Sequence, residues 1–334
     1  MRGFLRAGFV VASVGAASFV WASFDLMLLP GSDGRVYRYD PINRIQLGSF
    51  SSSSNNHMLA VDGAGQMFGC QSSGSSIRRY TYSNGELQGI LSGQTNTRAI
   101  NYSSNYVYVQ SASGVTRYLS TNGTNGGTEV LSAGTIWRTS AIVGNYLIAV
   151  GINASNFITM QSINLTTFAT SSIVTTTVTS SLATELGKAA IAVNSANGST
   201  MLAFTYLSGS NLQFGRMSLN TSGELSSGTM SSTTINALNG FSTTSVMPAA
   251  VAGHNGMFLY GPDFTSPTTL ARIEQFDMFN SLLSNNTTTI AIPGGSFAVN
   301  NGNWHPANVV APEPSTMLMG GVGGLAFLLR RRKR

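Results

Sequence analysis

Short strand-like runs recur along the middle of this chain, and their spacing limits the folds that it can adopt. Each run is rich in β-branched and aromatic residues and is bounded by Gly, Asn, Asp or Ser, which favour turns. Five runs align on one apolar position, with spacings of 40, 40, 55 and 56 residues between Met67, Val107, Leu147, Leu202 and Phe258. In most copies a second strand follows and carries an arginine. The period predicts one compact unit of antiparallel strands per repeat.

Protection of strand edges favours one way of assembling these units. Many short antiparallel strands would expose unpaired hydrogen-bonding edges, whereas radial repetition leaves only short and protected ones. We therefore expect an all-β fold, a β-propeller of about six to seven four-stranded blades. The segments VDGAGQMFG (61–69) and DGRVYRYDP (33–41) resemble the strand-turn-strand pattern of propellers of the quinoprotein and lyase-like type. A β-sandwich is the alternative, ahead of a β-helix, which needs a shorter and stricter period.

The same pattern sets the expected boundaries of the body. We expect a propeller-like domain over residues 23–305, followed by a linker over 306–311. The segment from Phe24 to Leu29 should close the ring by pairing near Ser296 to Asn300. The segment from Leu182 to Val193 contains good helix formers but also Gly187, so it is either a helix or a loop that leads into a strand.

The C-terminal residues 312–334 combine three features in a fixed order. Pro312, Glu313 and Pro314 form an extended triplet, because proline fixes φ and lacks an amide hydrogen. An apolar stretch then predicts a short transmembrane helix of roughly 21 Å. A basic tail, which resists translocation, ends the chain with Arg330, Arg331, Arg332, Lys333 and Arg334. An ordinary membrane anchor is the alternative interpretation.

This order resembles the PEP-CTERM sorting signal of Gram-negative bacteria. The resemblance implies recognition by an exosortase-type membrane protease, removal of the tail, and release to the cell surface or the extracellular polymer. Contact with the inner membrane through the C-terminal helix would then be transient.

The N-terminus is consistent with export. Arg2 and Arg6 precede an uncharged apolar stretch, which is typical of a signal peptide over residues 1–22 with a helical core. Cleavage by signal peptidase is expected between Ala22 and Ser23. The alternative is a retained N-terminal anchor, for which the apolar stretch is short.

The two ends carry the net charge of the chain. The chain has 18 Lys and Arg residues against 12 Asp and Glu residues, but seven of the basic residues and one acidic residue lie in the ends, so the body has 11 of each. A neutral body gives no electrostatic reason to expect a nucleic-acid partner. The single cysteine, Cys70, excludes an intramolecular disulfide and is expected to be a small buried apolar residue.

Residues with the spacing of a catalytic or metal site are sparse in the body. His57, His254 and His305 are far apart, and none has a metal-type spacing to another ligand. The acidic residues mostly flank turns, where an Asp side chain bonds the nearby backbone; these are Asp25, Asp33, Asp40, Asp62, Asp263 and Asp277. We therefore assign no catalytic residue, no metal and no cofactor, and we expect a protein that is not an enzyme.

Arginines recur on the second strand of several repeats, often with a tyrosine directly after them. The set comprises Arg38, Arg78 or Arg79, Arg117, Arg216 and Arg272, with Tyr39, Tyr80 and Tyr118. One interpretation is an arginine-aromatic surface that binds an acidic or carbohydrate ligand. The other is that the arginine stems cover the blade faces and pair with nearby groups.

Two functions remain. The first is an exported cell-surface or extracellular-matrix protein with a structural or binding role associated with exopolysaccharide. The second is a secreted propeller enzyme acting on polysaccharide, as a lyase or a glycoside hydrolase. The first is favoured because general acid-base chemistry needs titrating groups, which the body largely lacks.

Overall fold

The computed structural model describes residues 25–30, 34–40, 45–52, 58–70, 76–92, 96–180, 190–193, 200–209, 211–225, 229–234, 247–250, 256–262, 270–277, 283–291 and 307–310. One compact unit is the body, Phe24–Glu313, and the other comprises Met1–Ser23 with Pro314–Arg334. The expected signal helix and transmembrane helix lie outside the described residues. Among the residues listed above, no helix has the length and apolar character needed to cross a membrane.

The body is a β-propeller of antiparallel four-stranded sheets, as the repeat predicts. The second blade comprises β4 (Met58–Val61), β5 (Gln66–Cys70), β6 (Ile77–Thr81) and β7 (Leu87–Ser92). The third comprises β8 (Ala99–Ser103), β9 (Tyr106–Gln110), β10 (Gly114–Leu119) and β11 (Asn125–Val130). The fourth comprises β12 (Thr135–Val143), β13 (Tyr146–Asn153), β14 (Phe157–Asn164) and β15 (Ala169–Thr179).

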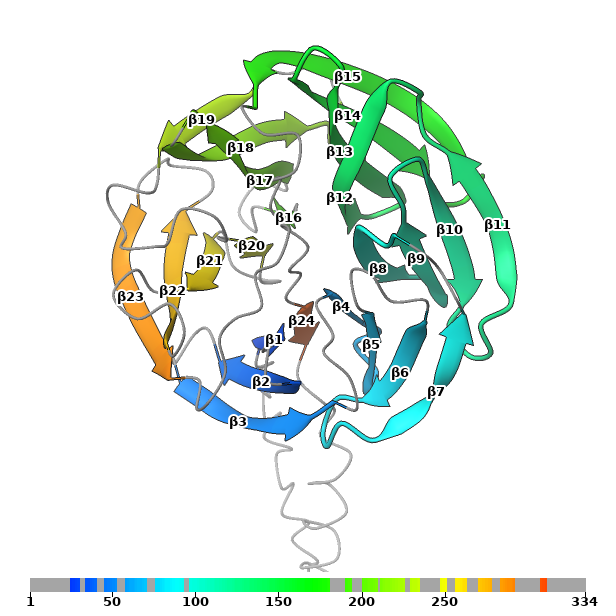
Figure 1. Cartoon of the computed structure of the whole chain (residues 1–334), viewed down its shortest axis with the longest axis vertical. Coiled ribbons are helices and arrows are strands. Elements are labelled where there is room, and N and C mark those ends of the chain that lie inside the picture. The colour runs from blue at the N-terminus through cyan, green and yellow to red at the C-terminus, as the bar shows by residue number, and fades with distance from the viewer. Residues whose placement is uncertain are drawn as a thin grey trace, which may run out of the picture. The chain divides into compact units, whose positions relative to one another are not determined.

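Two further blades follow in the same order. The fifth comprises β16 (Ala190–Val193), β17 (Thr200–Ser208), β18 (Asn211–Leu219) and β19 (Ser231–Thr234). The sixth comprises β20 (Met247–Ala250), β21 (Gly256–Pro262), β22 (Leu270–Asp277) and β23 (Leu283–Ala291). In each blade the first strand lies toward the centre of the ring and the fourth at its rim (Figure 1). The five aligned apolar positions all lie on second strands, and the ambiguous segment ends as the strand β16.

The first sheet joins both ends of the body. It contains β1 (Asp25–Pro30), β2 (Arg35–Asp40), β3 (Ile45–Ser51) and β24 (Ala307–Val310), in the order β24-β1-β2-β3. The described chain thus has six four-stranded sheets, of which five are built from strands contiguous in sequence and this one joins the two ends of the body.

The pairing that closes the ring corrects two sequence-based expectations. β1 pairs with β24 in the register Asp25↔Val310 to Leu28↔Ala307, not with residues near Ser296 to Asn300. The segment expected as a linker, 306–311, therefore contains the closing strand. Its short apolar, β-branched run explains the choice, because such residues suit a half-buried pleated surface.

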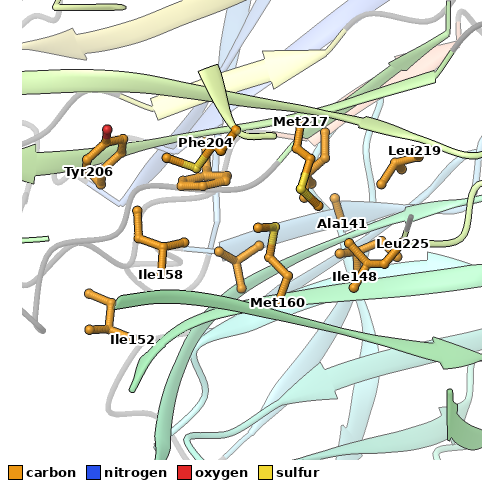
Figure 2. Packing of buried hydrophobic residues seen from close by; sticks show 13 residues of the cluster. Ala141, Ile148, Ile152, Ile158, Met160, Phe204, Tyr206, Met217, Leu219 and Leu225 are labelled. Atoms are coloured by element: carbon orange, nitrogen blue, oxygen red, sulfur yellow. The ribbon is translucent and has the colours of Figure 1, made fainter. Parts of the chain in front are cut away.

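The hydrophobic core lies between blades, so the inner strands are buried on both faces. Along β13, Leu147 and Ala149 pack toward the third blade, whereas Ile148, Val150 and Ile152 pack toward the fifth. Figure 2 shows the second of these clusters, in which Ile148, Ile152 and Ile158 face Phe204 and Met217. This double burial explains why the second strands read as continuous apolar runs instead of alternating ones.

Candidate functional site

The residues expected to direct export lie beyond the described part of the chain. These are Ala22 and Ser23, the triplet Pro312, Glu313 and Pro314, and the basic tail 330–334. The described chain begins at Asp25 and ends at Val310, and these two residues are partners in the β1–β24 ladder. In the sequence, each expected processing position therefore lies only a few residues outside one member of this pair.

The repeated arginines occupy equivalent positions, as the sequence predicts. On the third strand of their blades, Arg38, Arg79, Arg117 and Arg216 pair across to the second strand with Leu28, Phe68, Tyr108 and Ala203. In the fourth blade this position is Ser162, which pairs with Ile148. Arg272 does not belong to the set. In the sixth blade the equivalent position on the second strand is Leu259, and its partner on the third strand is Glu274, whereas Arg272 pairs with Gly261.

Each of the first three arginines reaches the next blade. Arg38 Nη1 donates to Ser83 O at 3.1 Å, and Arg79 Nη1 donates to Ser120 O at 3.1 Å and Thr121 O at 2.7 Å. The acceptors all lie in the turn that follows the third strand of the neighbouring blade. We call this repeated contact, made by Arg38, Arg79 and Arg117, the inter-blade latch.

The third member of the latch uses a ring instead of a carbonyl. The Arg117 guanidinium carbon lies 4.2 Å from the ring centroid of Phe168, in the turn after β14, and 5.0 Å from that of Tyr106. Arg117 Nε also donates to Gly126 O at 2.9 Å. At this boundary a cation–π contact of the arginine thus replaces the arginine-to-carbonyl hydrogen bond of the other two latch positions.

A glycine with positive φ lies ten residues after each latch arginine. Arg38, Arg79 and Arg117 are followed by Gly48, Gly89 and Gly127, whose φ values are +128°, +155° and +122°. These glycines lie on the fourth strand, where the register shifts beside the arginine. A Cβ at Gly48 would lie 3.3 Å from Arg38 Nη2. The sequence analysis missed this Arg-to-Gly spacing, which is visible in the printed sequence.

The fourth and fifth blades are joined by a different pair of groups. Ser162 Oγ accepts the N–H of Ser172 at 3.0 Å, and Ser172 Oγ donates to Glu224 Oε1 at 2.7 Å. Glu224 follows the third strand of the fifth blade, so it takes the place that carbonyls occupy elsewhere. Glu129 acts similarly, accepting the N–H of Thr170 at 2.8 Å across the preceding boundary.

The tyrosines of the predicted ligand surface are buried. Tyr39, Tyr80 and Tyr118 are exposed by 1%, 0% and 4%, and they pack in the blade cores. The expectation of an exposed arginine-aromatic face is therefore wrong for these three rings, because the residue after each latch arginine points to the opposite face of its strand. The arginines themselves remain partly exposed.

The remaining candidates have structural surroundings where they are described. Cys70 is buried, and burial raises the pKa of its thiol to about 11. Asp62 Oδ1 accepts the N–H groups of Ala64 at 2.8 Å and Gln66 at 2.9 Å, which confirms its role in a turn. All three histidines lie outside the described residues. Within the described ranges, no group of three His, Cys, Asp or Glu residues is placed to hold a metal ion.

Comparison with known proteins identifies the C-terminal motif. Residues 310–333 match the PEP-CTERM protein-sorting motif, so this chain carries that motif directly after β24. None of the curated proteins matches the chain in sequence. The motif implies an exported protein that is processed by an exosortase after transient membrane anchoring.

Solved structures resemble the body in fold alone. A chain in "Crystal structure of Nidogen/Laminin Complex" aligns with a TM-score of 0.57 at 10% identity, over 86% of this chain and 100% of that one. The Kuenenia stuttgartiensis hydrazine synthase aligns with a TM-score of 0.49 at 10% identity, over 74% of this chain and 72% of that one. A chain in "Crystal Structure of Mitotic Checkpoint Complex" aligns with a TM-score of 0.49 at 12% identity, over 76% of this chain and 72% of that one.

Proposed function

We propose that this protein is an exosortase-sorted component of the cell surface or extracellular matrix, with a non-catalytic structural or binding role associated with exopolysaccharide. The observation that carries the proposal is the PEP-CTERM motif at residues 310–333, which directly follows the strand that closes the propeller. In this proposal the folded body is the cargo, and the ends are removed by signal peptidase and by the exosortase.

The composition of the body supports an extracellular role. With equal numbers of acidic and basic residues, the body has no net charge, and its exterior relies on hydroxyl and amide groups for hydration. Such a surface changes little with ionic strength, because salt has few charges to screen. These properties suit a polymer-rich environment of variable salt.

Three of the described carboxylates have structural partners, which supports a non-catalytic role. Asp62 is engaged in a turn, and Glu129 and Glu224 are engaged between blades. A polysaccharide-cleaving site would need at least two acids that face one substrate. Acids that instead hold backbone and hydroxyl groups are consistent with a rigid binding or structural module.

Mass spectrometry of both termini, combined with cell fractionation, tests the proposal. In cells that contain the exosortase, we expect a mature form outside the cell that begins at Ser23 and ends close to Pro312. Replacement of Pro312, Glu313 and Pro314 by alanine should retain the intact chain in the inner membrane, whereas replacement of Pro293 and Pro306 should not. A chain that keeps its tail in the inner membrane whether or not the exosortase is present would refute the proposal.

Screening of the mature protein against glycans then tests its proposed role. Binding to extracellular polysaccharide without a decrease in polymer length is the expected result. Release of shorter or unsaturated oligosaccharides would instead establish the enzyme alternative.

A further inference from the structure

The outermost strands of the six sheets carry almost no charge. Each sheet ends in β3, β7, β11, β15, β19 or β23, and none of the described strands pairs with the outer edge of these six. Glu129 is the only charged residue along them, and they contain no proline. The latch arginines, such as Arg38 and Arg79, lie one strand further in. Charged residues and prolines are common devices that keep a sheet edge from pairing with another chain, so this rim lacks two of them.

Large apolar side chains are exposed along the same rim. Seven such side chains are exposed among the described residues, and only Ile136 of these lies on another strand, β12. The six on the rim are Ile45, Leu47, Leu87, Ile90, Val130 and Ile173. Exposed apolar side chains beside an open, neutral edge indicate a surface that another strand covers.

The strand of the rim best suited to such pairing is β15 (Figure 1). β3, β7 and β11 each contain a glycine at positive φ beside a register shift, and bulges of this kind bend an edge away from a partner. β15 contains no glycine and, at 11 residues, is the longest described strand. It also has two register shifts, but exposure alternates without interruption along its whole length, so one row of side chains stays outward. This β15 row comprises Ala169, Ser171, Ile173, Thr175, Thr177 and Thr179.

The third blade covers only the beginning of this edge. The N–H of Thr170 donates to Glu129 Oε1, on β11, at 2.8 Å. At the two register shifts, N–H groups of β15 donate to hydroxyl groups of the same blade. No described strand pairs with the outer edge of residues 171–179. Their outward backbone groups therefore form a template for one further strand.

We propose that β15 is a self-association surface, on which the β15 of a second copy pairs in antiparallel orientation, edge to edge. The strand has no charge, so its own copy meets no like-charge repulsion, whereas a charged polymer or lipid surface would find no opposite charge. Antiparallel pairing of two identical strands has two-fold symmetry, so the contact closes on itself as a dimer.

The alternation of the β15 row selects the register of this pairing. Full overlap of residues 171–179 in two copies places Thr175 opposite its counterpart and Ile173 opposite Thr177, so exposed residues pair with exposed residues. Threonines directly opposite each other can hydrogen-bond, and β-branched residues suit a pleated surface. One continuous sheet would then cross two bodies. This inference rests on the proposed function, because it specifies how a structural protein of the extracellular matrix associates with itself.

Cross-linking through introduced cysteines tests the register in the full chain, purified in detergent. A short bifunctional thiol reagent should join Thr175→Cys to its copy, because the two Cβ atoms would lie about 4.5–5.5 Å apart. Thr179→Cys should cross-link at least 10-fold less, since its two copies would lie eight residues, or about 27 Å, apart. The buried Cys70 gives the background, which the unaltered chain measures. Equal cross-linking at the two positions would overturn the inference.

Substitution by lysine tests whether the edge drives association. Thr175→Lys places two like charges opposite each other, so sedimentation of the full chain in detergent should show at least 10-fold weaker self-association, with an unchanged melting temperature. Thr175→Val should change it less than 2-fold. Thr124→Lys, the same change in the exposed turn after β10, should also change it less than 2-fold.

Two results of the sedimentation experiment would overturn the inference. One is an unaltered chain that does not self-associate, and the other is equal weakening by Thr175→Lys and Thr124→Lys. Export and processing of the same chain would then still uphold the proposed function, which fails only if the tail stays in the inner membrane irrespective of the exosortase.

Discussion

Replacement of Gly123 by alanine is predicted to separate the second and third blades. Gly123 lies in the turn between β10 and β11 at φ +75°, and its N–H donates to Leu119 O at 2.8 Å. A Cβ there would lie 2.6 Å from the carbonyl carbon and 2.7 Å from the Cα of Leu91, on the rim strand of the second blade. Backbone atoms cannot rotate aside as the end of a long side chain can, so the whole turn must shift away from β7.

The cost has two parts. An alanine at positive φ costs about 1–2 kcal/mol, offset in part by about 0.4–1 kcal/mol from the stiffer unfolded chain, which leaves about 1 kcal/mol. The shift of the turn also breaks the latch bonds from Arg79 Nη1 to Ser120 O and Thr121 O. These two bonds share one donor nitrogen and are partly exposed to water, so we assign them about 2 kcal/mol together, which is within the range for a single hydrogen bond to a charged group. The total is about 3 kcal/mol.

Gly134 offers a matched control for the backbone strain. It has φ +78°, and no heavy atom lies within 4 Å of a Cβ built on it. Gly134→Ala should therefore cost only about 1 kcal/mol. In thermal unfolding followed by circular dichroism, Gly123→Ala should melt about 4–8 °C below Gly134→Ala. Equal melting temperatures for the two variants would refute the argument that the turn of one blade seats against the backbone of the next.

Three further predictions test the core and its titrating groups. Phe204→Ala should lower the free energy of unfolding by about 3–5 kcal/mol, because the ring is fully buried between the fourth and fifth blades. Ile173→Ala, at a half-exposed position on the rim, should lower it by less than about 0.5 kcal/mol. Denaturant unfolding measures both variants, and similar losses would contradict this placement of the core. The Cys70 thiol, with its pKa raised to about 11 by burial, should react with a thiol reagent at pH 8 only after denaturant is added, and fast labelling of the native protein would show an accessible thiol. Burial also raises the pKa of Tyr206, despite its hydrogen bond with Ser232, so its contribution to stability is complete below the ordinary tyrosine pKa of about 10 and is lost as pH rises through the raised value. Tyr206→Phe should therefore lose less stability between pH 9 and pH 11 than the unaltered protein, and identical losses would show that Tyr206 ionises equally well when folded.

The repeat was predictable because each blade presents the same local pattern. Met67, Val107 and Leu147 all fall on second strands, which are buried on both faces and therefore read as apolar runs. The partner of β1 was not predictable in the same way, since the pairing joins residues almost 300 positions apart and any short β-branched run can supply it. The chosen run, 307–310, is distinguished only by lying just before the prolines.

The arginines show a similar division between local and non-local information. Their equivalence is a property of the repeat, and alignment of the copies reveals it. Their acceptors, such as Ser83 O and Thr121 O, are backbone carbonyls of the next blade. Every residue has such a carbonyl, so the amino-acid sequence does not indicate which residues accept.

The closing strand has a consequence for the order of events during synthesis and export. Five blades are built from neighbours in sequence, so each can form as soon as its own four strands have emerged. β1 must wait, with its inner edge unpaired, until residues 307–310 arrive at the very end of the body. A chain truncated before Ala307 would expose that edge as a template for pairing with another chain. A closed ring thus forms only on a chain whose entire body has been made and delivered.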